Sequence, residues 1–495
     1  MKITLLLFSV FSLFVFQLNA QQKPRTIITT DGEVDDMDSF IRLLMYANDL
    51  NIEGLIYSSS MWHYAGDGKG TPFTSEMDMT KRIYGARTEL RWCGTNWIQE
   101  LIDKYAKVYP NLIQHDREYP TPEYLKSIVR VGNIEFEGEM EKVTEGSDFI
   151  KNILLDESDE PVYVQTWGGT NTLARALKSI EEEYKGKAEW KEIQKRVSAK
   201  TFIYIILDQD ATYKKYIEPN WPEVKTVYNS MQFWCLAYSW PNTVPASQLY
   251  TLQGKWFSEN IRFGHGPLLE NYYLWGDGRQ IAGDPEHTHG SMEEAKKNGR
   301  EQYDFISEGD SPSYLYLLNF GLQNYGDPSF GGMGGRFVPS ADNPFKWIDG
   351  KQVTDFNPET GKQDASYPQA RWTKVLQNDF AARADWCVRD YQHANHAPEV
   401  RVSQNMMEAK PGQKIALSGK ATDPDKDGLT GRWWNYAEAG SYPGKIEVQQ
   451  TKEYGAEITV PEDAKSGQTI HLIFEVSDDG EPSLTRYQRV VMMIK

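Results

Sequence analysis

The stretch Ile27-Ile28-Thr29-Thr30-Asp31-Gly32-Glu33-Val34-Asp35-Asp36-Met37-Asp38-Ser39 carries more information than any other part of the sequence. An apolar run ending at Thr30 predicts a short buried strand, and apolar residues at helical spacing predict a helix over residues 35–48. Five carboxylates crowd the turn between these two elements. Like charges this close repel each other, and a cation that neutralises them makes them tolerable. The stretch therefore predicts a metal site at a strand-to-helix turn, with one carboxylate available as a base.

The same carboxylates also have a purely structural interpretation. Acidic residues are common in the first turn of a helix, where they stabilise its N-terminus. Asp35, Asp36 and Asp38 fit that position. Asp31 precedes the helix, at the end of the strand, so helix capping explains it poorly.

Strand and helix patterns alternate through the first half of the chain. Strands are expected over 26–30, 52–58, 162–167 and 201–207, and helices over 77–84, 96–108, 147–155 and 172–184. Such alternation is typical of an α/β fold, a mainly parallel sheet flanked by helices. Ligands of such sheets bind at the carboxyl ends of the strands, where we expect Asp31, Ser58–Ser60, Trp167–Thr170 and Asp208 to converge.

The character of the sequence changes near its C-terminus. A helix is expected over 369–389, and His393–Pro398 is interpreted as a linker. Beyond the linker, alternating runs separated by Pro, Gly and Asp predict strands over 400–402, 414–421, 429–435, 457–460, 470–477 and 486–494. This pattern predicts an immunoglobulin-like β-sandwich. The expected units are an α/β domain over 21–392 and the sandwich over 397–495.

Composition narrows the classes of partner and compartment. A net charge of −17 argues against nucleic acid and against an anionic membrane surface, because both attract basic patches. Residues 1–20 have the basic start, apolar run and small final residue of a signal peptide, and no cysteine follows them. We therefore expect a secreted or periplasmic protein that is not inserted in a membrane. Aromatic residues make up 13% of the chain, which suits either sugar stacking or a large core.

A family resemblance rests first on the opening stretch. An apolar strand, then Asp31 and Gly32, then the pair Asp35-Asp36 before an amphipathic helix resembles the inosine–uridine-preferring nucleoside hydrolases, whose signature is Asp-x-Asp-Pro-Gly-x-Asp-Asp. The resemblance implies that Asp31 is the general base and a Ca²⁺ ligand. It also implies that Asp35 and Asp36 contact sugar hydroxyls and Ca²⁺. The departures are Thr29 for the first Asp, Gly32 for Pro and Glu33 for Gly.

Two later stretches extend this resemblance. Trp167-Gly168-Gly169-Thr170-Asn171-Thr172-Leu173-Ala174 is similar to the family's Gly-Pro-Leu-Thr-Asn-Leu-Ala element. This implies that the Thr170 carbonyl ligates the metal and that Asn171 belongs to the substrate site. Glu308-Gly309-Asp310-Ser311-Pro312-Ser313-Tyr314-Leu315 lies where the family has a His-Asp pair, which makes Asp310 a Ca²⁺ ligand and Glu308 a substrate contact. Each stretch is also explained by a turn that caps a helix.

The whole chain resembles a secreted, cellulose-binding branch of this family, of the Sde182 type, which joins a nucleoside hydrolase-like domain to a β-sandwich. The runs Gln377–Arg383 and Trp386-Cys387 fit that branch. The loop after the second strand lacks the family's ribose-binding Asn and carries Trp62 and His63, which are expected to contact a different sugar. Asn220 is placed with the family's mid-chain sugar-binding Asn.

One further motif lies in the expected sandwich. Asp423-Pro424-Asp425-Lys426-Asp427-Gly428 has the spacing of a Ca²⁺-binding loop. The Glu that ends such loops is missing, and an acidic turn between strands is an equally good interpretation.

Together these features predict a Ca²⁺-dependent glycosyl hydrolase. Its cation is held by Asp31, Asp36, Thr170 and Asp310, and Asp31 takes the proton of the attacking water. The replaced ribose loop and the expected secretion favour a carbohydrate, such as a plant cell-wall glycan or glycoside, over a nucleoside. The alternative is a glycan-binding protein without turnover, which the missing first Asp favours.

Overall fold

A computed structural model describes residues 23–495, so the signal-peptide prediction for residues 1–20 lies outside the described residues.

The larger part of the chain is built on one eight-stranded sheet with the order β5-β2-β1-β6-β7-β8-β10-β9. All neighbouring strands are parallel except β9 and β10. The strands are β1 (Arg25–Thr30), β2 (Asn51–Tyr57), β5 (Val129–Val131), β6 (Val162–Thr166), β7 (Thr201–Ile206), β8 (Lys225–Asn229), β9 (Val338–Pro339) and β10 (Lys346–Ile348). The predicted α/β fold is confirmed.

Strand β1 lies inside the sheet and fixes the position of the carboxylate stretch. Each of its six residues is buried, as its run of β-branched side chains predicts. It pairs with β2 on one side and β6 on the other, with Thr29 opposite Ile56 and Thr166. The carboxyl ends of these three strands therefore meet at one edge of the sheet, directly before Asp31.

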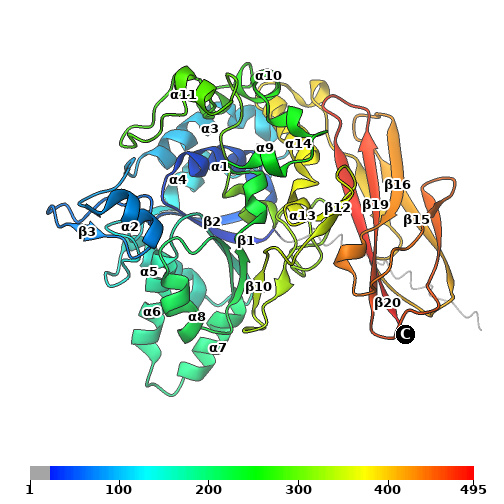
Figure 1. Ribbon diagram of the computed structural model, residues 1–495, viewed down its shortest axis with the longest axis horizontal. Helices are drawn as coiled ribbons and strands as arrows, with labels where there is room; N and C mark the ends of the chain where they lie inside the picture. The colour runs from blue at the N-terminus through cyan, green and yellow to red at the C-terminus, as the bar shows by residue number, and fades with distance from the viewer. Residues whose placement is uncertain (1–22) are drawn as a thin grey trace, which may run out of the picture.

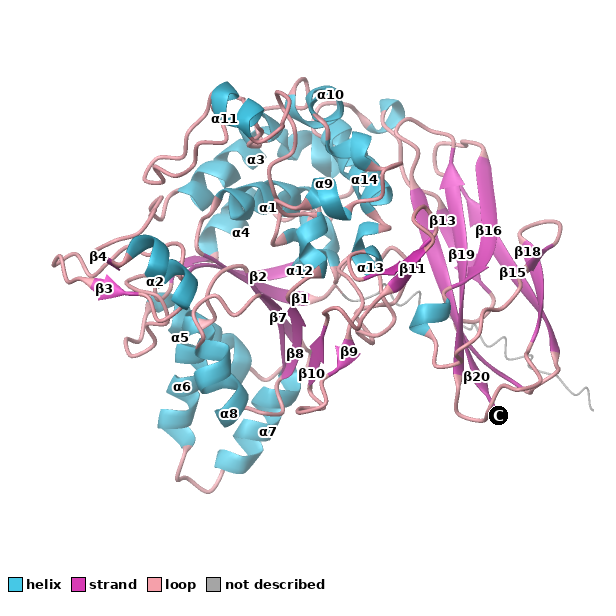
Figure 2. Cartoon of the chain, in the orientation of Figure 1, coloured by secondary structure: helices cyan, strands magenta, loops and turns pink. Residues whose placement is uncertain are grey.

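Helices cover both faces of the sheet (Figures 1 and 2). One face carries α1 (Val34–Met45), α3 (Trp97–His115) and α14 (Thr373–Trp386), and their apolar residues share a core that includes Phe40, Ile98 and Phe380. The other face carries α5 (Glu145–Leu155), α6 (Asn171–Tyr184) and α7 (Trp190–Lys200), whose apolar residues form a second core with Ile27 and Ile56.

Shorter elements connect this framework. They are β3 (Phe73–Thr74), α2 (Asp78–Tyr84), β4 (Ala86–Arg87), α4 (Pro122–Ser127), α8 (Glu218–Asn220), α9 (Trp240–Thr243), α10 (Gly254–Phe257), α11 (Met292–Lys297), α12 (Ser311–Leu315), β11 (Asp355–Asn357), β12 (Lys362–Asp364) and α13 (Tyr367–Ala370).

Two predicted helices differ from the observed ones. The helix expected over 96–108 continues through Pro110 to His115, because Leu112 in its last turn is buried in the core. The single helix expected over 369–389 is two helices, α13 and α14. Arg371 and Trp372 separate them, and the guanidinium of Arg371 pairs with the carboxylate of Asp355 at 3.2 Å. In both cases tertiary packing overrides the local pattern.

The C-terminal unit is a β-sandwich, as predicted. One sheet has the order β13-β15-β18-β17 and the other β14-β20-β19-β16. These strands are β13 (Glu399–Val402), β14 (Met406–Ala409), β15 (Lys414–Thr422), β16 (Leu429–Asn435), β17 (Gln449–Gln450), β18 (Gly455–Thr459), β19 (Thr469–Asp478) and β20 (Thr485–Ile494). Between the sheets, Trp433 stacks on Phe474 with ring centroids 5.0 Å apart.

The sandwich packs against the α/β domain, beside α13 and α14 (Figure 1). The amides of Tyr487 and Arg489 in β20 donate to the carbonyls of Phe320 and Gly321 at 2.9 and 3.1 Å. The fully buried guanidinium of Arg489 donates to three more backbone carbonyls. They belong to Leu322 (2.6 Å), Phe330 (2.8 Å) and Gly331 (2.9 Å). Backbone pairing and a buried cation thus join the two units. Among residues 23–495, no helix is both long and apolar enough to cross a membrane.

Replacing Arg489 by Met should loosen this junction. The substitution keeps an unbranched side chain but leaves buried carbonyls without donors, at about 1–3 kcal/mol for each unsatisfied group. We expect the free energy of unfolding in guanidinium chloride to fall by about 3 kcal/mol or more. Arg401→Met, at an exposed position of β13, is the control and should have little effect. Equal stabilities of the two variants would contradict the role assigned to Arg489.

Candidate functional site

The turn after β1 is fixed by its own backbone and by a close neighbour. Gly32 has φ +83°, and a Cβ placed on it would lie 2.7 Å from Sγ of Cys93 and 2.9 Å from Nε1 of Trp97. Asp36 reaches back to the turn, where its carboxylate accepts from the amide of Glu33 at 3.2 Å and from the hydroxyl of Thr30. The first turn of α1 is therefore locked to the end of the strand.

Three carboxylates from two distant segments meet beside this turn. Asp35, Asp36 and Asp310 each present an oxygen, and these oxygens lie within 4.8 Å of one another. Burial and the charges of Glu33 and Asp31 raise the pKa of Asp35 to about 8. Burial and neighbouring carboxylates raise the pKa values of Asp36 and Asp310 well above the ordinary range. Buried, mutually repelling oxygens of this kind fit a hard cation such as Ca²⁺.

Asp31 lies next to this triad in a different environment. It is 2% exposed, and neither carboxylate oxygen has a hydrogen-bond partner. Nδ1 of His63 lies 3.5 Å from Oδ2 of Asp31, and Nε2 of the same ring lies 3.8 Å from Oδ2 of Asp284. Asp284 in turn accepts two hydrogen bonds of 2.9 Å from Arg91. The four side chains form a buried row of alternating charge.

This row separates the pKa of Asp31 from those of its acidic neighbours. Burial disfavours the imidazolium of His63, but Asp284 and Asp31 outweigh burial and raise its pKa to about 9. Burial alone would raise the pKa of Asp31, but the His63 cation lowers it below its ordinary value. Asp31 is therefore ionised at neutral pH.

Two glycines allow these carboxylates to pack closely. A Cβ on Gly168, after β6, would lie 2.8 Å from Cγ of Asp31. A Cβ on Gly309, before α12, would lie 2.6 Å from Oδ2 of Asp35. No larger residue fits at either position without moving the acid it faces.

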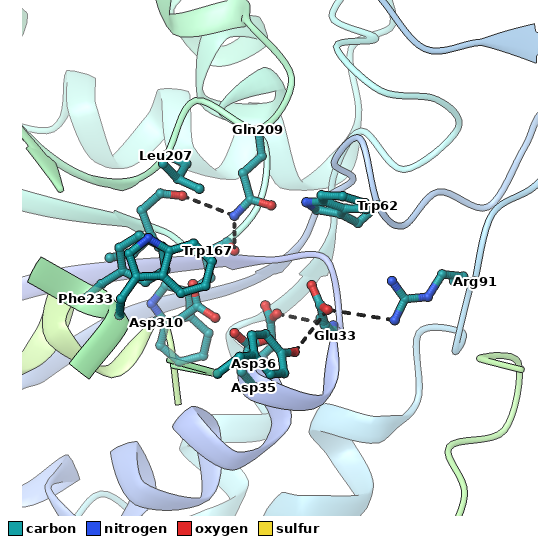
Figure 3. A pocket seen from close by; sticks show the side chains of 13 residues that line it. Glu33, Asp35, Asp36, Trp62, Arg91, Trp167, Leu207, Gln209, Phe233 and Asp310 are labelled. Carbon is teal, nitrogen blue, oxygen red and sulfur yellow. Dashed lines mark hydrogen bonds and ion pairs between the residues drawn. The ribbon is translucent and has the colours of Figure 1, made fainter. Parts of the chain in front are cut away.

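A cavity of about 260 Å³ opens above the triad. The residues that line it include the carboxylates Glu33, Asp35, Asp36 and Asp310 and the aromatic side chains Trp62, Trp167, Phe233, Trp234 and Tyr238. Figure 3 shows Trp62, Trp167 and Gln209 on one side of this space and Glu33, Asp35 and Asp36 on the other. The cavity therefore combines aromatic side chains with a floor of closely packed carboxyl groups.

The structure brings some of the predicted site residues together and not others. Asp35, Asp36, Asp310 and Trp62 line the cavity, and Asp31 lies beside them but does not line it. Among the described residues, the remaining predicted contacts His63, Thr170, Asn171, Asn220 and Glu308 do not line it either.

Two of these residues are fully buried and lie beside other charged side chains. His63 is fully buried behind Asp31 and cannot stack on a ligand in the cavity. Glu308 is fully buried and pairs with Arg42 at 2.6 Å. We therefore withdraw both as substrate contacts.

Thr170, Asn171 and Asn220 have local structural roles. The carbonyl of Thr170 accepts the amide of Ala174 at 2.9 Å as α6 begins. The amide group of Asn171 donates to Ser59 and to the carbonyl of Asn133, both at 2.9 Å. Asn220 donates to the carbonyl of Tyr216 at 2.8 Å. Thr170 thus stands at the N-terminus of α6, as the helix-capping interpretation expects, although its side chain makes no capping hydrogen bond.

Several site residues had no signal in the sequence. Arg91 and Asp284 come from irregular segments 193 residues apart. Gln209 follows β7 and donates to the carbonyls of Trp167 (3.2 Å) and Ile206 (3.1 Å). Only Gln209 had a usable hint, because it lies one residue beyond the predicted sheet-edge position Asp208. The aromatic walls around Phe233, Trp234 and Tyr238 lie in a loop-rich region without periodic pattern.

Comparisons with known proteins agree with this architecture. Residues 25–337 match the family described as cellulose-binding Sde182, nucleoside hydrolase-like domain. Residues 414–494 match the C-terminal domain of cellulose-binding protein Sde0182. No protein of curated function matches the chain.

A solved structure shares the fold over almost the whole chain. It is a nucleoside hydrolase-related hypothetical protein from Saccharophagus degradans, described as associated with carbohydrate metabolism. It is 24% identical, with a TM-score of 0.71, and the match covers 96% of this chain and 100% of the other. Titin module M5 also matches, at 14% identity and a TM-score of 0.15, over 20% of this chain and 96% of its own.

Asp310→Asn should stabilise the protein when divalent cations are removed. At pH 7 the folded wild type must either protonate this buried carboxyl or keep an unfavourable charge, and both weaken folding. Because one pKa unit corresponds to about 1.4 kcal/mol, we expect a gain of about 1 kcal/mol or more in the free energy of unfolding. Urea denaturation in EDTA measures it.

The gain should shrink as the pH falls toward about 4, where the carboxyl is protonated in the unfolded chain as well as in the folded one. Asp342→Asn, at an exposed loop position, is the matched control. If Asp310→Asn lowered the free energy of unfolding in EDTA at pH 7, the repulsion inferred between Asp310 and the neighbouring buried carboxylates would be contradicted.

Proposed function

Because the chain belongs to the family of cellulose-binding Sde182 proteins with a nucleoside hydrolase-like domain, we propose that its cavity binds a terminal sugar residue and hydrolyses the glycosidic bond. The observation that carries this proposal is the juxtaposition of aromatic walls and a carboxylate triad around one space of about 260 Å³. Binding sites for drug-sized ligands are typically about 300–1,000 Å³, so this cavity suits a smaller group such as one sugar ring.

The donor set supports Ca²⁺ as the cofactor. Asp35, Asp36 and Asp310 would hold it, since their oxygens already converge. When bound, the cation would acidify a water molecule and orient sugar hydroxyls. Thr170 is left out of this ligand set, because it does not line the cavity.

Asp31 is the proposed catalytic base. The water oxygen bonds to the anomeric carbon while the bond to the leaving oxygen breaks. Asp31 takes the water proton, and the leaving oxygen takes up a proton from solvent. Two observations support this role: Asp31 has no hydrogen-bond partner on either oxygen, and His63 keeps it ionised. Arg91 and Asp284 hold His63 in place behind it.

The side chains around the cavity favour a carbohydrate over a nucleoside. Trp62 and Trp234 line the cavity, and indole rings suit the apolar face of a sugar ring. Arg91 lies 3.8 Å from Glu33, so both are placed to bond sugar hydroxyls at the rim. We propose a glycan or glycoside as the ligand, and an extracellular or periplasmic location in which such glycans are met.

A second candidate function is glycan binding without turnover. It is favoured by one observation, namely that Asp31 does not itself line the cavity. In this version the aromatic walls and the cation bind the sugar and no bond is broken. The two functions differ in the role of Asp31. A hydrolase needs Asp31 for bond cleavage, whereas a binding protein does not need it for its interaction with the ligand.

Asp31→Asn separates the two functions. If the protein is a hydrolase, the variant should release sugar from oligosaccharides at least about 100-fold more slowly, because proton transfer by a positioned base is worth about 10²–10⁴. Its dissociation constant for the same oligosaccharide should change little. Trp62→Ala should instead weaken binding roughly tenfold through lost ring stacking.

Tyr250→Ala, at an aromatic side chain that is 45% exposed and outside the cavity, is the control for Trp62. Reducing-sugar release and isothermal titration measure the two effects. The hydrolase proposal would be wrong if no sugar were released from any cell-wall oligosaccharide while binding depended on Trp62 and not on Asp31. The protein would then be a binding protein without turnover.

Asp310→Asn should weaken the binding of Ca²⁺, so that Ca²⁺ reverses the stability difference expected between this variant and the wild type in EDTA. In EDTA the variant is expected to be the more stable protein, but it has lost one of three carboxylates that would hold the cation. We expect its affinity for Ca²⁺ at this cavity to be lower by at least roughly 100-fold. Titration of tryptophan fluorescence reports on this site, because Trp62, Trp167 and Trp234 line it. Unchanged Ca²⁺ affinity would exclude Asp310 as a ligand.

A further inference from the structure

A second carboxylate cluster lies in the β-sandwich, at the turn between β15 and β16. Asp423, Asp425 and Asp427 each present an oxygen, and these oxygens lie within 4.8 Å of one another. An acidic turn at the surface does not by itself define a site, because such turns are common and well solvated. What distinguishes this one is the group of side chains packed against it.

Three buried oxygens at this place have no hydrogen-bond partner. They are Oδ2 of Asp423, Oδ1 of Asn395 and Oδ2 of Asp478. Asn395 is 6% exposed and Asp478 is 5% exposed, so bulk water does not satisfy them. Buried polar atoms are almost always paired, and unpaired ones often mark a bound ion or water. Their presence points to a ligand.

The three segments that carry these oxygens converge. Nδ2 of Asn395, in the linker, donates to Oδ1 of Asp478 at 3.3 Å. A Cβ placed on Gly480 would lie 2.5 Å from both Cγ of Asn395 and Oδ2 of Asp427. The linker and the β19–β20 turn therefore close over the acidic turn.

We propose that Asp423, Asp425, Asp427, Asp478 and Asn395 form a Ca²⁺ site in the sandwich, independent of the cavity in the α/β domain. Ca²⁺ takes six to eight oxygen ligands in flexible geometry, and here carboxylate and amide oxygens supply them. The Glu missing from the end of the sequence loop is replaced by oxygens from two other segments.

This site would act on the junction between the two domains. The residue after Asn395 is His396, whose amide donates to Oδ2 of Asp425 at 2.7 Å. The ring of His396 lies between Asp425, at 3.0 Å, and His115 of α3, at 2.9 Å. A cation that orders Asp425 and Asn395 thus orders the linker at its contact with the α/β domain.

Ca²⁺ binding to the full chain tests the proposal. Asp310→Asn serves as the background, so that the cavity does not contribute, and CaCl₂ is titrated after EDTA treatment and dialysis. We expect this chain to bind one Ca²⁺ and to melt several degrees higher in CaCl₂. Adding Asp427→Asn should weaken that binding by at least roughly 100-fold and abolish the shift in melting temperature. Asp463→Asn, at an exposed carboxylate of the same sandwich, is the control and should preserve both.

Circular dichroism shows whether each chain is folded. If the double variant fails to fold, Asp427→Asn alone is compared with the wild type, where the number of bound Ca²⁺ should fall from two to one. No Ca²⁺ bound by the folded Asp310→Asn chain would overturn the site, and so would equal binding with Asp427→Asn. Neither result bears on the cavity, whose ligands are different residues.

Discussion

The repulsion between buried carboxylates at the end of β1 is the constraint around which the α/β domain is organised. Asp35 and Asp36 lie in the first turn of α1, and Asp310 arrives from a segment more than two hundred residues later. A protein can tolerate such a cluster only if the surrounding structure holds the acids in place or a cation neutralises them. The fully buried strand and the close approach at Gly309 provide the first condition. The raised pKa values show that packing alone does not relieve the repulsion, which either a proton or a cation would neutralise.

Asp31 illustrates how the same crowded turn can produce two kinds of carboxylate. Burial and mutual repulsion raise the pKa values of its neighbours, whereas His63 outweighs burial and lowers the pKa of Asp31. Groups whose environments push their pKa values apart are those that take different roles in catalysis. The row from Asp31 through His63 to Asp284 and Arg91 therefore has an electrostatic role as well as a packing role. It sets one acid apart from the cluster as a permanent anion.

The sequence allowed much of this to be predicted, for physical reasons. The strand and α1 followed from local periodicity, and the acidic turn from the density of charge between Asp31 and Asp38. Asp310 was found through a motif of short range. What could not be predicted depends on contacts between irregular segments, such as Arg91 with Asp284. Thr170 and Asn171 were assigned to the site through the family resemblance. A helix-capping turn and a ligand-binding turn use the same residue types, and the structure places both residues at the N-terminus of α6, outside the cavity lining.

The docking of the sandwich limits what that domain can do. A module on a flexible linker would move independently of the domain to which it is joined, but here β20 pairs with the backbone at Phe320 and Gly321. The buried Arg489 adds directional bonds that a hinge motion would break one by one. The sandwich must therefore move with the α/β domain, and any surface it offers to a glycan keeps a fixed relation to the cavity. A cation at the linker would reinforce that relation, since Asn395 and His396 stand where the chain crosses from one unit to the other. On these grounds we propose different roles for the two acidic clusters: the one beside the cavity would act on a ligand, and the one beside the linker would hold the two domains in their relative position.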